Sequence, residues 1–301
     1  MSKFEVPEID YTPYSNRQLA AVPLALLAVA LVVILGWYVV FGTPVGLSTD
    51  FTGGTELTVQ TDTPRSELDT AFDADIVSKQ RVQGPSITEP TYILTFGPET
   101  NGTVLEDQAQ ANLQATCSNT DECELVQARQ TTSPSFGSSA RTTAAQGLFA
   151  AFLGMSILAF VFFRSFVPSI AIVISAFSDI VIPLAAMNLL GIKLSLGTVA
   201  ALLMLIGYSV DSDILLNNHV LRRSGEFYDS VHRAMETGVT MTITSIAAMA
   251  VMTVVATLFG IELMASIGLV LVLGLAADLV NTYMLNLSLL RWYKLGEVTP
   301  E

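Results

Sequence analysis

Four aspartates stand inside stretches that are otherwise apolar enough to lie in lipid: Asp179, Asp211, Asp213 and Asp278. A carboxylate near the centre of a membrane helix costs about 2.5–3.5 kcal/mol on insertion scales. Polar groups at that depth must face other helices or a wet cavity, and their usual roles are ion relay and substrate contact. These oxygens can take up and release H⁺, or they can coordinate Na⁺. The alternative is a set of anchors between helices, but neutral polar residues would form such hydrogen bonds at lower cost.

The aspartates of segment 196–217 lie on two different faces. At about 100° per residue, Asp213 shares a face with Ser209 and Asn217, whereas Asp211 lies almost opposite, beside Tyr208. A helix with two polar faces has no side to offer to lipid, so the sequence predicts that it is central in a bundle. Ser209, Ser212, Asn217 and Tyr208 are therefore candidates for supporting a carboxylate relay.

Pro183 follows Asp179 by four residues in segment 167–190. Proline has no N–H group, so the carbonyl of Asp179 loses its helical hydrogen bond beside the carboxylate. Two readings stay open: an ordinary proline tolerated in a membrane helix, or a kink that lets the helix flex where the charge changes.

Several kinds of chemistry are absent from the sequence. It contains no phosphate-binding loop, no set of Cys and His residues at metal-binding spacing, and no Ser nucleophile in a Gly-x-Ser-x-Gly turn. We therefore expect no enzymatic activity and no cofactor other than H⁺ or Na⁺ as a coupling ion. Energy would come from the membrane gradient or from ATP use by a partner.

Composition indicates a membrane protein. Of the 301 residues, 51% are hydrophobic and 14% are charged, against roughly 25% charged in average soluble domains. This composition excludes a single soluble globule and a disordered chain. The net charge of −13 makes nucleic acid an unfavourable partner. Six segments can cross a bilayer as helices: 19–41, 142–163, 167–190, 196–217, 239–259 and 264–290.

The predicted fold is an α-helical polytopic membrane protein with a small α/β domain between its first two membrane helices. Its parts are a cytoplasmic N-terminus (1–18), the first helix (19–41), an extracytoplasmic domain (42–141), a five-helix bundle (142–290) and a cytoplasmic C-terminus (291–301). The orientation in the cytoplasmic membrane follows from the Lys and Arg residues, which gather in the short segments of one side. We also expect a short interfacial helix over residues 226–236, capped near Gly225 and Gly238.

The domain has the pattern β-α-β-β-α-β, which is typical of a ferredoxin-like fold. We expect strands at 56–61, 76–83, 91–96 and 122–128, and helices at 64–73 (with Thr63 as N-cap) and 103–115. Cys117 and Cys123 flank the last loop and form either a disulfide or two free thiols. Asn101 begins an N-glycosylation sequon.

The domain carries 14 acidic residues against five Arg and Lys residues. An acidic, Lys-poor surface is expected in a halophile, where high salt screens the self-repulsion. The alternative is a basic partner for this face.

Three motifs resemble the SecF family, the smaller subunit of the SecD–SecF accessory complex of the protein translocase, and more distantly the resistance-nodulation-division exporters. Asp50-Phe51-Thr-Gly53-Gly54 is similar to the family's Gly-x-Asp-Phe-x-Gly-Gly signature, with Ser48 in place of the first glycine. Ser178-Asp179-Ile180 falls on its His-Asp-Val. Residues 207–213 fall on its Gly-Tyr-Ser-x-Asn-Asp-Thr, with Ser212 where bacterial members have the acid.

The resemblance implies a function: with SecD, the chain would help unfolded polypeptides cross the membrane through the SecY channel, using the proton or sodium gradient. It also implies an archaeal member whose Asp211 or Asp213 carries the ion, and a second six-span chain that covers the central helix. Gly53-Gly54 would fix how the domain pivots on the first helix, although a simple turn explains the pair equally well. The other readings are half of a small-molecule exporter and a gradient-independent scaffold of the channel. An intramembrane aspartyl protease is a further reading, but neither of its signature motifs occurs here.

Overall fold

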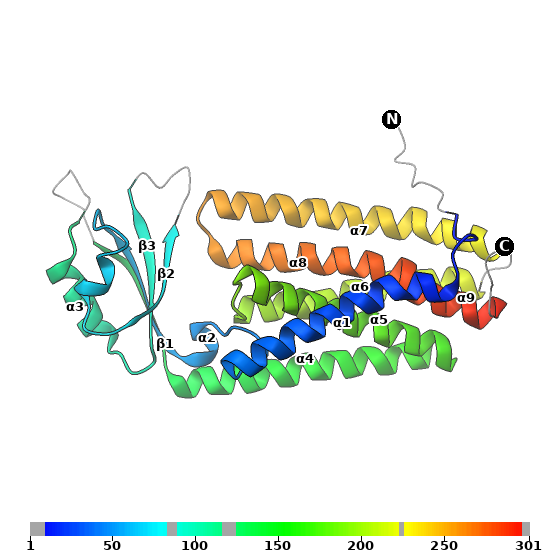
Figure 1. Ribbon diagram of the computed structural model, residues 1–301, viewed down its shortest axis with the longest axis horizontal. Coiled ribbons are helices and arrows are strands. Elements are labelled where there is room, and N and C mark those ends of the chain that lie inside the picture. Colours follow the sequence, from blue (N-terminus) through cyan, green and yellow to red (C-terminus); the bar gives the residue numbers. More distant parts are fainter. Residues whose placement is uncertain (1–9, 83–88, 116–124, 223–225, 297–301) are drawn as a thin grey trace.

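The computed structural model describes residues 10–82, 89–115, 125–222 and 226–296. A small β-sheet domain lies at one end of a long helical bundle, and the bundle helices run roughly along the long axis of the molecule (Figure 1). The first bundle helix begins, and the last one ends, at the end opposite the sheet. This arrangement follows from an even number of spans.

Six helices are long and apolar enough to cross a membrane. They are α1 (Asn16–Phe41), α4 (Pro134–Phe163), α5 (Phe166–Leu190), α6 (Leu196–Arg222), α7 (Phe227–Leu258) and a last helix over Glu262–Leu295. That last helix consists of α8 (Glu262–Val280), a π-helical turn η2 (Asn281–Asn286) and α9 (Leu287–Leu295). The predicted fold class is confirmed.

The largest differences from the predicted spans are at the starts of α4 and α7. α4 begins at Pro134 instead of residue 142, because Ser133 caps it and Pro134 occupies its first turn. The separate interfacial helix predicted over 226–236 is wrong: these residues form the first turns of α7, which continues through Gly238. Gly238 does not end the helix because it packs closely against the Tyr283 hydroxyl.

The domain contains a four-stranded antiparallel sheet of β1 (Gly54–Gln60), β2 (Ile76–Val82), β3 (Thr91–Phe96) and β4 (Val126–Thr132). The strand order β2-β3-β1-β4 is that of the predicted ferredoxin-like fold. Leu57 pairs with Leu94 and Val59 with Tyr92, so their side chains share one face of the sheet. This face and the helix α3 (Gly102–Asn112) enclose the domain's apolar core.

The prediction of a first domain helix over 64–73 is wrong. Only a 3₁₀ turn, η1 (Leu68–Ala71), forms there, and it buries Leu68 and Ala71. The Thr63 hydroxyl accepts from the backbone N–H of Gln114 instead of capping a helix. The segment has too few apolar residues to make a helical face that could pay for ordering a longer helix.

The remaining domain predictions are close to the observed elements. α3 is capped by Asn101, whose side chain accepts from the Thr103 N–H at 3.0 Å. β4 extends to Thr132, four residues beyond its predicted end. The start of that predicted strand, at 122–124, and the Cys117–Cys123 pair lie outside the described residues.

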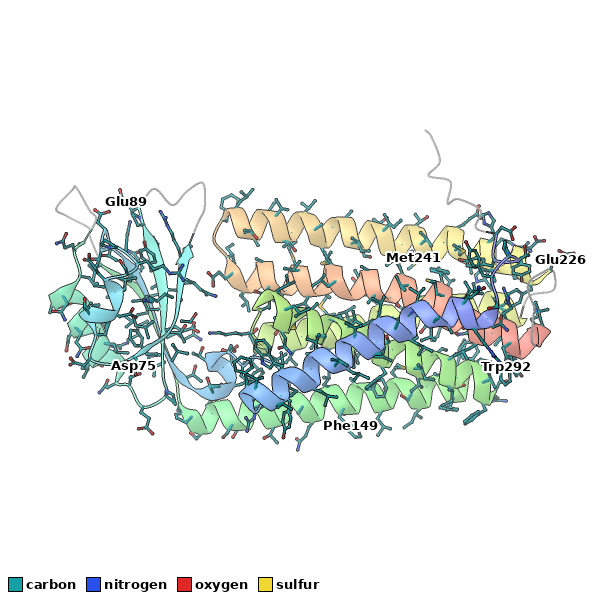
Figure 2. All side chains as sticks on the ribbon, in the orientation of Figure 1. Asp75, Glu89, Phe149, Glu226, Met241 and Trp292 are labelled. Atoms are coloured by element: carbon teal, nitrogen blue, oxygen red, sulfur yellow. The ribbon has the colours of Figure 1, made fainter. Side chains whose placement is uncertain are left out.

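α6 lies inside the bundle, where it packs against α4, α5, α7 and α8. Its face with Asp211 is exposed, so only one of its two polar faces is covered within this chain. Its contact with α8 depends on Gly274, where an added Cβ would collide with the side chain of Leu205. In a membrane, small residues allow this close approach of helix backbones. Figure 2 shows the outer surface of the bundle, where the side chains of Phe149 on α4 and Met241 on α7 are exposed.

A buried guanidinium joins the two ends of the chain. Arg291 of α9 is completely buried and donates to the carbonyls of Tyr11 (2.9 Å) and Tyr14 (2.5 Å) and to Asn16 Oδ1 (2.5 Å). The side chain of Tyr11 is itself buried, and this burial raises the pKa of its phenol to about 12. Arg291 thus fixes the entry to α1 against the last helix.

We predict that Gly274→Ala destabilises the bundle by about 1–3 kcal/mol, because the new methyl group forces α6 and α8 apart. The matched control is Gly147→Ala on α4, where an added Cβ meets nothing within 4 Å. The control should leave stability unchanged or raise it by up to about 1 kcal/mol. Unfolding of the two purified variants in detergent measures the difference, and equal stability would contradict a close α6–α8 contact.

Candidate functional site

Three of the four membrane aspartates lie at the junction of α5, α6 and α8. Asp179 on α5, Asp213 on α6 and Asp278 on α8 are each at most 1% exposed. Hydroxyl and amide groups from neighbouring helices hydrogen-bond to all three. Within the described ranges, no Lys, Arg or His side chain donates to any of them.

Asp179 is held from two helices. Its Oδ2 accepts from the Ser209 hydroxyl of α6 at 2.6 Å, and its Oδ1 accepts from Asn281 Nδ2 of η2 at 2.5 Å. Ser178 donates to the amide oxygen of the same Asn281 at 3.3 Å. The carboxylate therefore joins α5 to both of the other helices that carry an aspartate.

Asp213 has one satisfied oxygen and one unsatisfied oxygen. Its Oδ1 accepts from Asn286 Nδ2 at 2.7 Å and from the Thr282 hydroxyl at 3.0 Å. Its Oδ2 is buried and has no hydrogen-bond partner in the described part of the chain, and the same is true of Ser175 Oγ and the amide oxygens of Asn217 and Asn286. An unpaired buried oxygen is costly, so Asp213 Oδ2 is a place where a bound proton or cation would be favourable.

Asp278 shares its donors with neighbouring acceptors. The Ser212 hydroxyl lies 2.9 and 3.0 Å from its two oxygens and also 2.9 Å from the Ser209 carbonyl. The Thr282 hydroxyl lies 3.3 Å from Asp278 Oδ1 and 3.0 Å from Asp213 Oδ1. Each hydroxyl has a single hydrogen, so these acceptors outnumber the hydrogens available to them. An additional proton on either carboxyl group would complete the hydrogen bonds.

The π-helical turn η2 brings Asn281 and Asn286 to the same cluster. In an α-helix, residues five apart would point about 140° away from each other. A π-helical turn bonds residue i to i+5, so the two amides here reach Asp179 and Asp213 respectively. Asn286 was not among the predicted site residues, although it follows Asp278 by eight residues on the same helical stripe, and Ser178 was named only as part of a motif.

The other candidate residues lie around this cluster or away from it. Asp211 is exposed and lines a small pocket of about 80 Å³ with Tyr208 and residues of α7. Asn217 donates to the backbone carbonyl of Asp213, at 2.9 Å, and not to its carboxylate. Pro183 is buried within α5, which is helical without interruption from Phe166 to Leu190.

The motif around Asp50 forms the joint between the domain and the bundle. Asp50 lies in the short helix α2 (Thr49–Thr52), and its Oδ2 accepts from the N–H of Leu196 at 3.0 Å, at the first residue of α6. Ser48 donates its N–H to the Leu194 carbonyl at 2.9 Å, and Leu194 donates to the Gly46 carbonyl at 2.6 Å. The entry to the domain is therefore bonded directly to the start of the helix that carries Asp213.

Gly53 and Gly54 form a turn in which both residues have positive φ, +76° and +134°. At Gly53 an added Cβ would lie 2.9 Å from the backbone of Pro134, and at Gly54 it would collide with the Phe96 carbonyl. The pair thus allows α2, β1 and the start of α4 to meet. Phe51 is buried beside this turn.

Among the described residues, no group of three or more His, Cys, Asp or Glu side chains is placed to hold a metal ion. A Na⁺ ion at the carboxylate cluster would therefore need hydroxyl and amide oxygens among its ligands.

Two protein-family models match the chain. Residues 38–64 match the SecD/SecF GG motif, and residues 112–296 match the C-terminal region of the protein export membrane proteins SecD and SecF. The first match contains Asp50, Gly53 and Gly54, and the second contains the three clustered aspartates.

Similar proteins cover the whole chain. It is 62% identical to the protein-export membrane protein SecF of Haloferax volcanii, over 99% of this chain and 100% of that one. It is 59% identical to the SecF of Haloquadratum walsbyi, over 98% of each chain. The chain belongs to the SecF family. The predicted family is thereby confirmed, and these haloarchaeal relatives support the halophilic character read from composition and the archaeal origin that the resemblance implied.

The fold resembles that of a solved SecF-containing structure. The crystal structure of SecDF from Thermus thermophilus, titled a translocon-associated membrane protein, matches with a TM-score of 0.72 at 20% identity. The match covers 97% of this chain and 39% of that chain. The SecF fold described here is therefore equivalent to part of a longer polypeptide.

We predict that Thr282→Val lowers stability by about 0.6–2 kcal/mol, because it removes the hydroxyl between Asp213 and Asp278 with little change of shape. The control is Thr244→Val on α7, whose exposed hydroxyl bonds only to the Thr240 carbonyl of its own helix. Unfolding in detergent measures both variants. A loss in the control as large as that in Thr282→Val would contradict a bridging role.

Proposed function

We propose that the chain is an accessory subunit of the Sec protein translocase that, with SecD, promotes the export of unfolded polypeptides through the SecY channel. Binding and release of H⁺ or Na⁺ by the buried carboxylates would link export to the membrane gradient. The observation that carries this proposal is the cluster of Asp179, Asp213 and Asp278, which is buried without a described cationic partner.

The charge of the cluster supports ion binding. Three ionised carboxylates, away from water and close enough to share hydroxyl donors, would repel one another and lack solvation. The cluster is favourable only when protons or cations reduce its charge. A carboxylate that gains a proton becomes a donor, so the hydrogen bonds from Ser212 and Thr282 must rearrange. These two residues lie on α6 and η2, and their rearrangement would shift one helix relative to the other.

The joint at Asp50 offers a route for such a shift to reach the domain. α6 carries Asp213 and begins at Leu196, which bonds to Asp50 at the entry to the domain. A helix transmits an axial movement along its length because its backbone is rigidly hydrogen-bonded. Movement of α6 would thus displace α2 and β1. The domain would then change its position relative to the bundle as the exported chain passes.

The distribution of charge supports an orientation with the sheet domain outside the cytoplasm. Arg17, Arg164 and Arg233 stand near the ends of α1, α4 and α7 that lie opposite the sheet, whereas Arg141 and Lys193 stand towards the sheet. By the positive-inside rule, the arginine-rich end would face the cytoplasm together with both termini.

A second six-span chain would cover part of the bundle surface. Leu203, Met204, Tyr208 and Asp211 are exposed on α6, although α6 is the central helix. An exposed carboxylate is unfavourable in lipid and favourable against a polar partner. SecD is the partner that we propose for this surface.

The described part of the domain argues against an exporter of small apolar molecules. Its interior is filled by the apolar side chains of the sheet and α3. A pocket of about 370 Å³ lies at its surface, but it is lined by polar groups such as Asp62, Glu67 and Asn112. An apolar substrate would find little to bind there.

We predict that Asp213→Asn and Asp278→Asn each reduce secretion of a reporter protein by at least about tenfold, and that the defect does not respond to the imposed gradient. An amide keeps the shape of the carboxylate but cannot change its charge. Asp211→Asn tests the opposite face of α6: it should keep the response of secretion to the imposed gradient, even where it weakens the proposed contact with SecD. Variants would be compared at equal membrane levels across a series of imposed H⁺ and Na⁺ gradients.

The same series distinguishes the alternatives. If the Asn variants at all three clustered positions export as well as the unmodified chain, the ion-relay proposal is wrong and a passive scaffold of the channel is favoured. If Asp211→Asn is the most defective variant, the relay lies on the opposite face of α6.

We also predict that Asp50→Ala slows secretion severalfold while destabilising the protein by only about 1 kcal/mol, the usual effect of losing a helix cap. Asp62→Ala, on the exposed surface of the domain, is the control. Secretion and unfolding in detergent are measured in parallel. Normal secretion by Asp50→Ala would show that the joint is not needed for coupling.

A further inference from the structure

An apolar pocket of about 390 Å³ lies between α1 and α4 at the domain end of the bundle. Both helices pack against α5, but they make few contacts with each other, and this leaves a groove between them. Leu184 of α5 and Leu202 of α6 line its inner wall. The loop after α1 and Phe51 of α2 line it on the domain side.

Almost all of the lining is apolar, and Arg141 is the single charged residue in it. Arg141 is exposed, and no ion pair to it occurs in the part of the chain that the structure describes. The nearby carboxylate of Asp50 is engaged by the N–H of Leu196 instead. Arg141 therefore places a guanidinium at the edge of an otherwise apolar pocket.

The apolar lining of the groove and the guanidinium of Arg141 are arranged like the hydrocarbon chain and the headgroup of a lipid. The apolar part of the groove, at Ile34 and Leu148, lies within the membrane-spanning segments. Arg141 stands seven residues before Leu148 on α4, which is about 10 Å along the helix axis towards the domain. This separation is suited to a molecule with a hydrocarbon chain and an anionic head.

We infer that this groove binds one membrane lipid with an anionic phosphate headgroup, from the leaflet on the domain's side of the membrane. Its acyl or alkyl chain lies between α1 and α4, and its phosphate is held by the planar guanidinium of Arg141. The pocket volume of about 390 Å³ is in the range of small-molecule sites, which suits a single hydrocarbon chain. The lipid chain would pack against Phe51, on the membrane side of the joint between the domain and the bundle.

The two tryptophans of the chain provide a test with an internal control. Trp37 lies one turn after Ile34 on α1, with its ring near Gly46 of the loop that lines the pocket. Trp292 is on α9 at the opposite end of the bundle, where it is 52% exposed. The variants Trp292→Phe and Trp37→Phe each leave a single fluorophore.

The experiment places the full chain in neutral phosphatidylcholine nanodiscs that contain a small fraction of a brominated lipid. Brominated phosphatidylglycerol should be enriched near Trp37 about fivefold over brominated phosphatidylcholine, the preference expected from one cation near a membrane surface. Trp292 lies at the arginine-rich end of the bundle, so it reports the general enrichment of anionic lipid, and its quenching should not change in Arg141→Gln. Equal quenching of Trp37 by the two lipids would overturn the proposal, because it would indicate ordinary contact with bulk lipid.

Two variants assign the effect to the groove. Arg141→Gln should abolish the preference for phosphatidylglycerol at Trp37, whereas Arg141→Lys should retain most of it. Ala144→Phe, which fills the pocket, should reduce quenching of Trp37 by both lipids. Ala150→Phe, on an exposed part of α4 outside the pocket, should not. An unchanged preference in Arg141→Gln, or its loss on addition of inorganic phosphate alone, would contradict a lipid site.

Discussion

The burial of three carboxylates among helices that are themselves surrounded by lipid constrains the rest of this structure. Each carboxylate needs donors, and the described donors are neutral hydroxyl and amide groups from the neighbouring helices. The helices must therefore approach closely, which explains why Gly274 faces Leu205 where α6 meets α8. One polar cluster thus determines which helix faces are in contact, and it leaves the apolar side chains of α1, α4 and α7 for lipid or for a partner.

The second constraint is the connection between this cluster and the domain. α6 carries Asp213 near its middle and bonds at its first residue to Asp50. The Gly53-Gly54 turn then leads directly into β1, a central strand of the sheet. These bonds join a charge-bearing helix to the sheet through a few residues, without a long flexible linker. An ion-dependent movement in the membrane would therefore not be lost before it reached the domain.

The sequence predicts those features that depend on local composition and fails on those that depend on tertiary contacts. Hydropathy is enough to find six spans, and a run of β-branched and aromatic residues is enough to find β3 at its observed bounds. The continuation of α7 through Gly238 was missed because it depends on packing against Tyr283, a residue far away in the sequence. The π-helical turn was missed for the same reason, and with it the place of Asn286. Periodicity correctly separated Asp213 from Asp211, since their faces on α6 follow from helix geometry alone.

Ser212 illustrates how the cluster and the helix contacts depend on each other. The motif resemblance implies that bacterial members of the family have an acid at the equivalent position. Here the hydroxyl of Ser212 lies within 3.0 Å of both oxygens of Asp278. An aspartate at residue 212 would bring a second carboxylate against the first, and two like charges at that distance cannot both remain ionised. The serine is therefore consistent with the placement of the negative charge on α8.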